Sequence, residues 1–89
     1  MKKIFLFSSK YCNDCTAMKA FLMQNNIEYI NMDITENLLF LKKFLNYRDT
    51  STAFTGVKEK GCIGIPCLVA NEGEKFYFQL EAIDLNELR

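Results

Sequence analysis

The hydrophobic pattern of the chain changes its period several times, and each change predicts a new element of secondary structure. Residues 3–8 hold a short apolar run bounded by polar residues, which is typical of a buried strand. In residues 13–25 apolar positions recur at helical spacing and stop at two asparagines, which predicts a helix. Residues 28–33 alternate and predict a second strand. Together they form a βαβ unit of about thirty residues, with parallel strands and a right-handed crossover.

The second half of the chain predicts a longer helix and then a hairpin. Residues 35–37 can cap a helix that runs to about Tyr47, and polar residues 49–52 end it. Its buried side is expected to carry five apolar residues: Leu38, Phe40, Leu41, Phe44 and Leu45.

A short helical piece over residues 53–60 comes next, and a strand follows Pro66. Residues 71–74 predict a hairpin turn into a last strand at 75–80, and residues 83–89 predict a short helix. The predicted class is therefore α/β with a mixed sheet.

Composition and charge indicate one small domain. A chain of 89 residues is too short for two cores, and 49% hydrophobic residues suffice for one, so residues 1–89 are expected to form a single domain. The net charge is zero and no basic stretch exceeds two residues, which gives no footprint for nucleic acid. No apolar run approaches a membrane span, and the run after Lys3 is too short for a signal peptide. We therefore expect a cytoplasmic protein without a membrane partner.

The chain contains four cysteines and no histidine. In a reducing compartment this cysteine count indicates redox chemistry or metal binding. The absence of histidine excludes Cys₂His₂ zinc sites, Cys–His nucleophile pairs and triads built on imidazole. Any general acid or base must be a carboxylate, a lysine, a tyrosine or a thiol.

Cys12 and Cys15 form a C-x-x-C motif at the turn from the first strand into the first helix. Thiols at this spacing can close a disulfide with little backbone movement. Cys12 would lie at the helix N-terminus, which favours negative charge, and is the expected nucleophile. Cys15, one turn into the helix, is expected to be more buried and to resolve a mixed disulfide. Asp14 should disfavour a neighbouring thiolate and make the couple more reducing, whereas Lys10 should act in the opposite direction.

A second motif, Ile65-Pro66-Cys67, contains the only proline of the chain and precedes a strand. With the C-x-x-C after the first strand and the βαβ return, it makes the chain resemble the glutaredoxin family of the thioredoxin-like superfamily, especially small bacterial glutaredoxin-related proteins. The resemblance covers about residues 3–80. It implies a three-layer fold with a four-stranded mixed sheet in the order 2-1-3-4. It also implies a cis Ile65–Pro66 bond that faces Cys12.

The resemblance further implies a thiol–disulfide oxidoreductase. Its substrate would be a disulfide-containing protein or a small-molecule disulfide, and a thiol reductant, usually glutathione, would complete the cycle. We expect a monomer with no bound cofactor. The residues expected to contact the substrate are Lys10, Tyr11, Ile65 and Pro66, with Cys67 and Arg48 as possible auxiliary residues. The backbone of Ile65 would pair with an extended thiol peptide.

Several positions depart from the family pattern. Asn13-Asp14 replaces the usual Pro-Tyr or Pro-Phe spacer, Ser9 occupies the place of a common lysine, and Gly64 replaces a threonine. Residues 71–74 are acidic where the family has a Gly-Gly turn. The electron donor therefore stays open between glutathione and a flavoprotein of the thioredoxin-reductase type.

Other assignments of the cysteines also stay open. One alternative function is zinc or iron–sulfur binding by Cys12 and Cys15, with Cys62 and Cys67 as further ligands, although a C-x₄-C spacing is unusual for zinc ribbons. The resemblance also implies the alternative of a cluster scaffold, in which Cys12 and glutathione bridge an iron–sulfur cluster between two protomers. Cys67 could point toward Cys12 or pack in the core. Arg48 could capture a substrate carboxylate or be a solvated charge at a helix end.

Overall fold

The computed structural model describes residues 3–88, apart from the side chain of Glu72. Its strands are β1 (Ile4–Ser8), β2 (Ile30–Asp33), β3 (Cys67–Ala70) and β4 (Lys75–Tyr77). Its α-helices are α1 (Asn13–Gln24), α2 (Leu38–Thr50), α3 (Thr55–Glu59) and α4 (Leu85–Leu88). Short 3₁₀ turns lie at η1 (Thr52–Phe54), η2 (Asn71–Gly73) and η3 (Leu80–Ala82). No helix in this part of the chain is long and apolar enough to cross a membrane.

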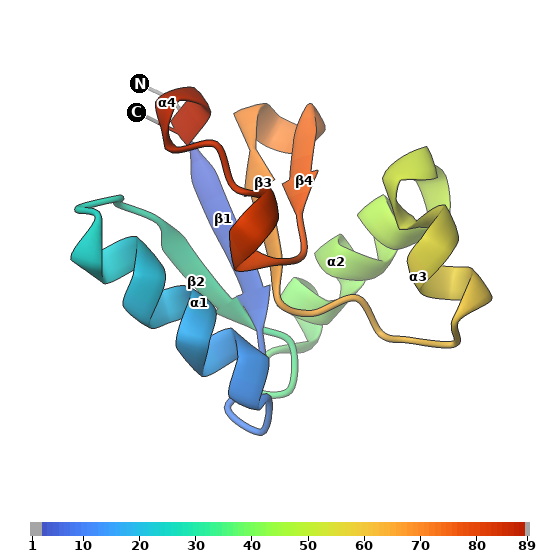
Figure 1. Cartoon of the computed structure of the whole chain (residues 1–89). Helices are drawn as coiled ribbons and strands as arrows, with labels where there is room; N and C mark the ends of the chain where they lie inside the picture. Colours follow the sequence, from blue (N-terminus) through green and yellow to red (C-terminus); the bar gives the residue numbers. More distant parts are fainter. Residues whose placement is uncertain (1–2, 89) are drawn as a thin grey trace.

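The four strands form one sheet in the order β2-β1-β3-β4 (Figure 1). β1 runs parallel to β2 and antiparallel to β3, and β4 is antiparallel to β3. α1 makes the crossover between the parallel strands β1 and β2. The predicted mixed sheet and its strand order are therefore confirmed.

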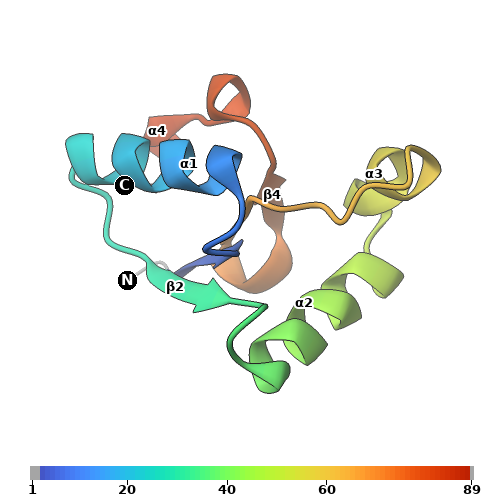
Figure 2. The same ribbon diagram turned by 90° about the horizontal axis from the view of Figure 1, so that it is seen from below.

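Helices cover both faces of the sheet and make three layers. α1 and α4 lie on one face, and α2 lies on the other (Figure 2). All five residues of β1 are buried, which explains why this strand has a continuous apolar run instead of an alternating pattern. Its side chains still point alternately to the two faces, with Leu6 on the α1 side and Phe7 on the α2 side.

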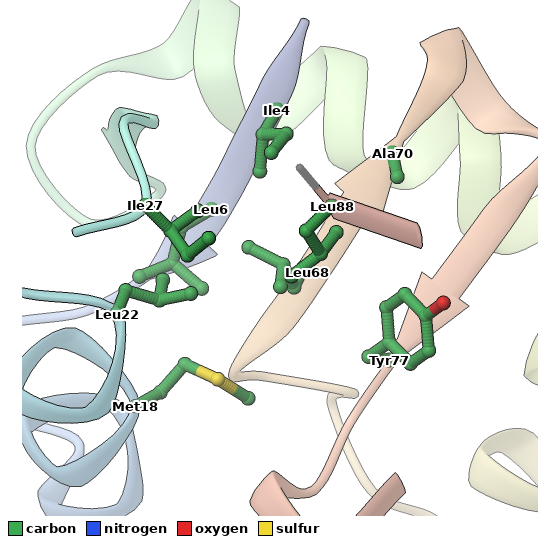
Figure 3. Close-up of a cluster of buried hydrophobic side chains, with 9 residues drawn as sticks. All are labelled: Ile4, Leu6, Met18, Leu22, Ile27, Leu68, Ala70, Tyr77 and Leu88. Atoms are coloured by element: carbon green, nitrogen blue, oxygen red, sulfur yellow. The ribbon is translucent and has the colours of Figure 1, made fainter. Parts of the chain in front are cut away.

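The core on the α1 side, which we call the α1-face cluster, is mostly aliphatic (Figure 3). Met18 and Leu22 extend from α1 toward Leu68 and Leu6 of the sheet, and Leu88 of α4 joins them (Figure 3). The cluster consists of Ile4, Leu6, Met18, Leu22, Ile27, Leu68, Ala70, Tyr77 and Leu88. α1 therefore docks through residues one helical turn apart.

The core on the α2 side, which we call the α2-face cluster, is built around aromatic rings. The ring of Phe44 lies 5.3 Å from that of Phe7 and 5.8 Å from that of Phe54, measured between centroids. Phe54 also contacts Phe76 at 5.2 Å and Phe78 at 5.0 Å, both edge-on. Tilted and edge-to-face rings are the favoured arrangement of aromatic pairs, so these contacts join α2, η1 and β4 to β1.

The expected buried side of the second helix was partly wrong. Phe44 is fully buried and Phe40 and Leu41 are partly buried, but Leu38 is 81% exposed and Leu45 40% exposed. Each residue advances about 100° around a helix, so Leu38 and Leu45 lie roughly 100–120° away from Phe44. All five residues are apolar, but only three share the face that meets the sheet.

The ends of other elements also differ from the sequence expectations. The last strand was expected over 75–80 but ends at Tyr77, which pairs with Leu68. Pro66 lies two positions before Leu68, on the side of the neighbouring strand. A proline nitrogen carries no hydrogen, so Pro66 cannot donate the next hydrogen bond between β3 and β4. α2 continues to Thr50, beyond the expected end at Tyr47.

Two other predicted segments differ in kind. The expected hairpin turn is the 3₁₀ turn η2, in which Asn71 has a φ of 53° and Gly73 a φ of 106°. The C-terminal helix expected over 83–89 is the shorter α4, and position 89 lies outside the described residues.

Replacing Phe44 with alanine tests the α2-face cluster. We expect the free energy of unfolding to fall by about 3–5 kcal/mol, because the substitution removes a fully buried ring. Leu38→Ala on the same helix is the control and should change it by less than about 0.5 kcal/mol. Urea denaturation measures both, and Phe44→Leu gives an intermediate loss if the alanine variant does not fold. Similar losses for Phe44→Ala and Leu38→Ala would contradict this arrangement.

Candidate active site

Cys12 is the N-cap of α1. Its Sγ accepts a hydrogen bond from the backbone N–H of Cys15 at 3.2 Å, and its own N–H donates to the carbonyl of Ser9 at 3.0 Å. Cys12 is partly exposed, while Cys15 is fully buried beneath the first turn. Both are free thiols. The expected difference in burial between the two sulfurs is confirmed.

The two thiols lie in different electrostatic surroundings. Burial raises the pKa of Cys15, and its interaction with Cys12 raises it further, to about 12. Lys19 and the backbone of Ser9 act in the opposite direction but do not reverse the change. At neutral pH Cys15 is therefore protonated, and the more accessible sulfur of the pair is Cys12.

The loop before Cys12 is anchored to the end of β2 by Asp33. The carboxylate of Asp33 accepts the backbone N–H of Lys10 at 2.9 Å, the N–H of Thr35 at 2.8 Å and the hydroxyl of Thr35. Burial alone would raise the pKa of Asp33, but these hydrogen bonds outweigh it and lower the pKa below its ordinary value. A charged carboxylate therefore holds the two loops together.

A second contact joins the same loops. The hydroxyl of Ser9 lies 3.2 Å from that of Thr35 and accepts the backbone N–H of Tyr11 at 3.1 Å. Sequence reasoning did not select Asp33, Ser9 or Thr35 as site residues. The signal that could have found them is Asp-x-Thr directly after a strand, a typical turn in which side chains bond to the local backbone.

The ammonium of Lys10 has two neighbours within the chain. It lies 3.3 Å from a carboxylate oxygen of Glu36 and 5.3 Å from the ring centroid of Tyr11. Tyr11 is 78% exposed, so its ring stands out from the surface beside Cys12. The exposed Lys10–Glu36 pair is of a kind that contributes little to stability.

The bond between Ile65 and Pro66 is cis, as the resemblance implied. Ile65 and Cys12 line one groove of about 570 Å³, which we call the apolar groove. It is lined by Ser9, Tyr11, Cys12, Ile34, Thr35, Gly61, Cys62, Ile63, Gly64 and Ile65. The structure thus brings together three of the expected site residues, Tyr11, Cys12 and Ile65. The volume of the apolar groove is within the range of ligand-binding sites.

Pro66 faces a different, smaller hollow of about 210 Å³. Asp14 and Met18 of α1 line one side of it, and residues 78–81, after β4, line the other. We call it the second hollow. The two depressions are therefore lined by consecutive residues, Ile65 and Pro66.

Arg48 supports the loop that forms one wall of the apolar groove. Its Nε donates to the carbonyl of Ile63 at 2.9 Å, and a terminal nitrogen donates to the carbonyl of Cys62 at 2.7 Å. The guanidinium is therefore engaged within the chain, which differs from a simple solvated charge at a helix end. Gly64, in the same loop, has a φ of 105°, a conformation that favours glycine.

The other two cysteines lie in different surroundings from each other. Cys67 is fully buried in the α2-face cluster, where burial raises its pKa, while α1 and Cys15 lie on the opposite side of the sheet. Cys62 is exposed on the groove wall. Among residues 3–88 no three side chains of metal-binding type gather in one place. The alternative of a zinc or iron–sulfur site therefore has no support in this geometry.

A C-x-x-C at the start of α1 and a cis-proline at the start of β3 define a protein with the thioredoxin fold. The family model described as glutaredoxin matches residues 4–73, and the chain belongs to the glutaredoxin family. An uncharacterized protein of Haemophilus influenzae is 32% identical over 89 residues, covering 100% of this chain and 96% of the relative. The resemblance inferred from the motifs is confirmed.

Replacing Asp33 with asparagine tests the anchor of the active-site loop. The pKa of Asp33 is lower in the folded chain, so its carboxylate stabilises the fold above the unfolded pKa of about 3.9. This contribution is lost as the pH falls through the folded pKa. We expect Asp33→Asn to lower the free energy of unfolding by about 1–3 kcal/mol at pH 7, and by much less in acid.

Urea denaturation between neutral and acid pH measures this effect. Glu36→Gln is the matched control, because Glu36 is an exposed carboxylate on the same loop. It should cost less than about 1 kcal/mol. A loss for Asp33→Asn that is the same at every pH would argue against the charged anchor.

Proposed function

We propose that this chain is a thiol–disulfide oxidoreductase that uses Cys12 as its nucleophile and Cys15 as its resolving thiol. The observation that carries the proposal is the asymmetric pair at the start of α1. Cys12 opens into the apolar groove, while Cys15 is fully buried and has a pKa raised to about 12. Membership of the glutaredoxin family supports the same class of reaction.

The proposed reaction has two exchange steps. The Cys12 thiolate attacks one sulfur of the substrate disulfide, the substrate S–S bond breaks, and one substrate thiolate leaves and takes up a proton from water. Cys15 then loses its proton and attacks the Sγ of Cys12, which releases the second substrate thiol and leaves a Cys12–Cys15 disulfide. The substrate gains two electrons, and the C-x-x-C pair loses them.

The groove supports binding of an extended segment next to Cys12. In the described part of the chain no hydrogen bond uses the backbone N–H or C=O of Ile65, so both are available to a substrate. Pairing with one exposed backbone residue is a short version of strand addition. The exposed side chains of Tyr11 and Ile63 lie on the walls of the same groove and supply apolar contact area.

A thiol donor must return the pair to its reduced form. Glutathione and a flavoprotein reductase are the two candidates. The two electrons that the disulfide accepts come from two glutathione molecules, which leave as glutathione disulfide, or from one dithiol of a reductase. The lining of the apolar groove has no cationic side chain, and Lys10 and Arg48 already have partners, which favours a donor other than the anionic glutathione. We place the reaction in the cytoplasm, because a reducing thiol pool keeps such a pair active.

Single substitutions of the two cysteines test the proposal. With Cys15→Ser, a disulfide substrate should remain joined to Cys12, because the resolving thiol is absent. With Cys12→Ser, neither turnover nor an adduct at position 12 is expected, and peptide mapping distinguishes this from an adduct at the exposed Cys62. Mass spectrometry of the unreduced protein detects the adduct, and consumption of the reductant measures turnover.

Cys67→Ala is the control for this experiment. Its sulfur lies in the α2-face cluster, so the variant should retain turnover once circular dichroism has shown that it is folded. Turnover at the wild-type rate in Cys12→Ser would overturn the assignment.

A further inference from the structure

The second hollow differs in charge from the apolar groove. Asp14 and Glu81 are the only charged side chains in its lining, and both are carboxylates. Neither forms an ion pair within residues 3–88. The lining of the apolar groove contains no charged side chain. One side of the site is therefore neutral and apolar, and the other side is anionic.

Both depressions lie within reach of one bound segment. Ile65 lines the apolar groove and Pro66, the next residue, lines the second hollow. Near the start of α1, Cys12 lines the first and Asp14, two residues later, lines the second. Residues of an extended chain are about 3.3 Å apart. Consider a substrate segment that pairs with Ile65 and presents its cysteine to Cys12. The residue on one side of that cysteine would lie at the apolar groove, and the residue on the other side would lie at the second hollow.

The second hollow suits a long basic side chain better than a small ammonium ion. Its lining includes the apolar side chains of Met18 and Phe78, and Asp14 and Glu81 are exposed residues. Lys and Arg bury their aliphatic stems along apolar surface and keep their charge in water. Acidic neighbours of a substrate cysteine would be repelled by the same carboxylates.

We propose that the substrate is a protein disulfide in an extended segment, with an apolar residue on one side of the reacting cysteine and Lys or Arg on the other. The proposal rests on the proposed function and adds only which disulfide reacts. The bonds that form and break are those of the exchange at Cys12. Asp14 and Glu81 act as specificity-determining residues that contact the substrate away from the reacting sulfurs.

Short peptides test the preference in a single step. Each carries one cysteine as a mixed disulfide with 2-nitro-5-thiobenzoate. Cys15→Ser/Cys62→Ser protein is used, because Cys62 is an exposed free thiol and its removal leaves Cys12 as the accessible thiol of the site. One series places Lys, Gln or Glu directly after the cysteine, and another places them directly before it. Absorbance of the released nitrothiobenzoate gives the second-order rate constant.

In one of the two series we expect the Lys peptide to react about threefold to tenfold faster than the Glu peptide at low salt. The ratio should approach one at high salt and in the Asp14→Asn/Glu81→Gln double variant. Glu81→Gln alone should also lower the ratio of the Lys rate to the Glu rate. This variant leaves Asp14 in place, so a lower ratio would not be due to a change in Cys12 caused by Asp14. Glu28→Gln, an exposed carboxylate between α1 and β2, is the matched control and should leave the ratio unchanged.

Equal rates for the three peptides in both series, or a preference that survives the double variant, would overturn the basic-residue assignment. A small disulfide pair, cystamine and the disulfide of thioglycolate, tests the need for a peptide. A cationic preference as large in this pair as in the peptides would overturn the peptide assignment. In both cases the proposed function stands if release of the substrate thiol still requires Cys12. Release of that thiol at the same rate when Cys12 is also replaced by serine would overturn the proposed function instead.

Discussion

The loop that presents Cys12 is held against the end of β2 by the carboxylate of Asp33, which accepts hydrogen bonds from Lys10 and Thr35. This contact sets the position of the loop and the charge of Asp33 together. The hydrogen bonds lower the pKa of Asp33, so the anchor stays ionised at neutral pH. α1 can then begin at Cys12, whose sulfur caps the helix by accepting the N–H of Cys15. The position of Cys12 thus depends on Asp33, a residue outside the C-x-x-C motif.

The two-sided sheet gives the cysteines different environments. Because side chains alternate along β3, Cys67 enters the α2-face cluster, while the neighbouring Leu68 enters the α1-face cluster. Burial raises the pKa of Cys67, and no described contact links it to the C-x-x-C pair. Cys12 instead lies where a helix begins and two loops meet. The same amino acid is therefore a packing residue at one position and an accessible thiol at another.

Most of the fold could be predicted from the sequence, because its strongest signals are local. The continuous apolar run of β1, the C-x-x-C at a helix start and the single proline before β3 each require one kind of structure. The errors arise where the structure of a residue depends on contacts with another part of the chain. Leu38 is apolar but faces away from the sheet, and the last strand ends early because its neighbour reaches Pro66. The role of Asp33 as an anchor was missed because the donor that links it to the active-site loop, the N–H of Lys10, lies 23 residues earlier in the chain.

The coupling between the two thiols also sets the order of the proposed exchange. Burial makes the largest contribution to the raised pKa of Cys15, and the hydrogen bond and charge of Cys12 add to it. The part due to Cys12 depends on that sulfur being free. Once Cys12 is in a mixed disulfide it carries no charge, so this part is lost and Cys15 ionises more readily, while Lys19 continues to favour its thiolate. The restraint on the resolving thiol is therefore weaker after the first step than before it, although burial continues to act. This change needs no histidine, because formation of the mixed disulfide itself removes the part of the restraint that is due to Cys12.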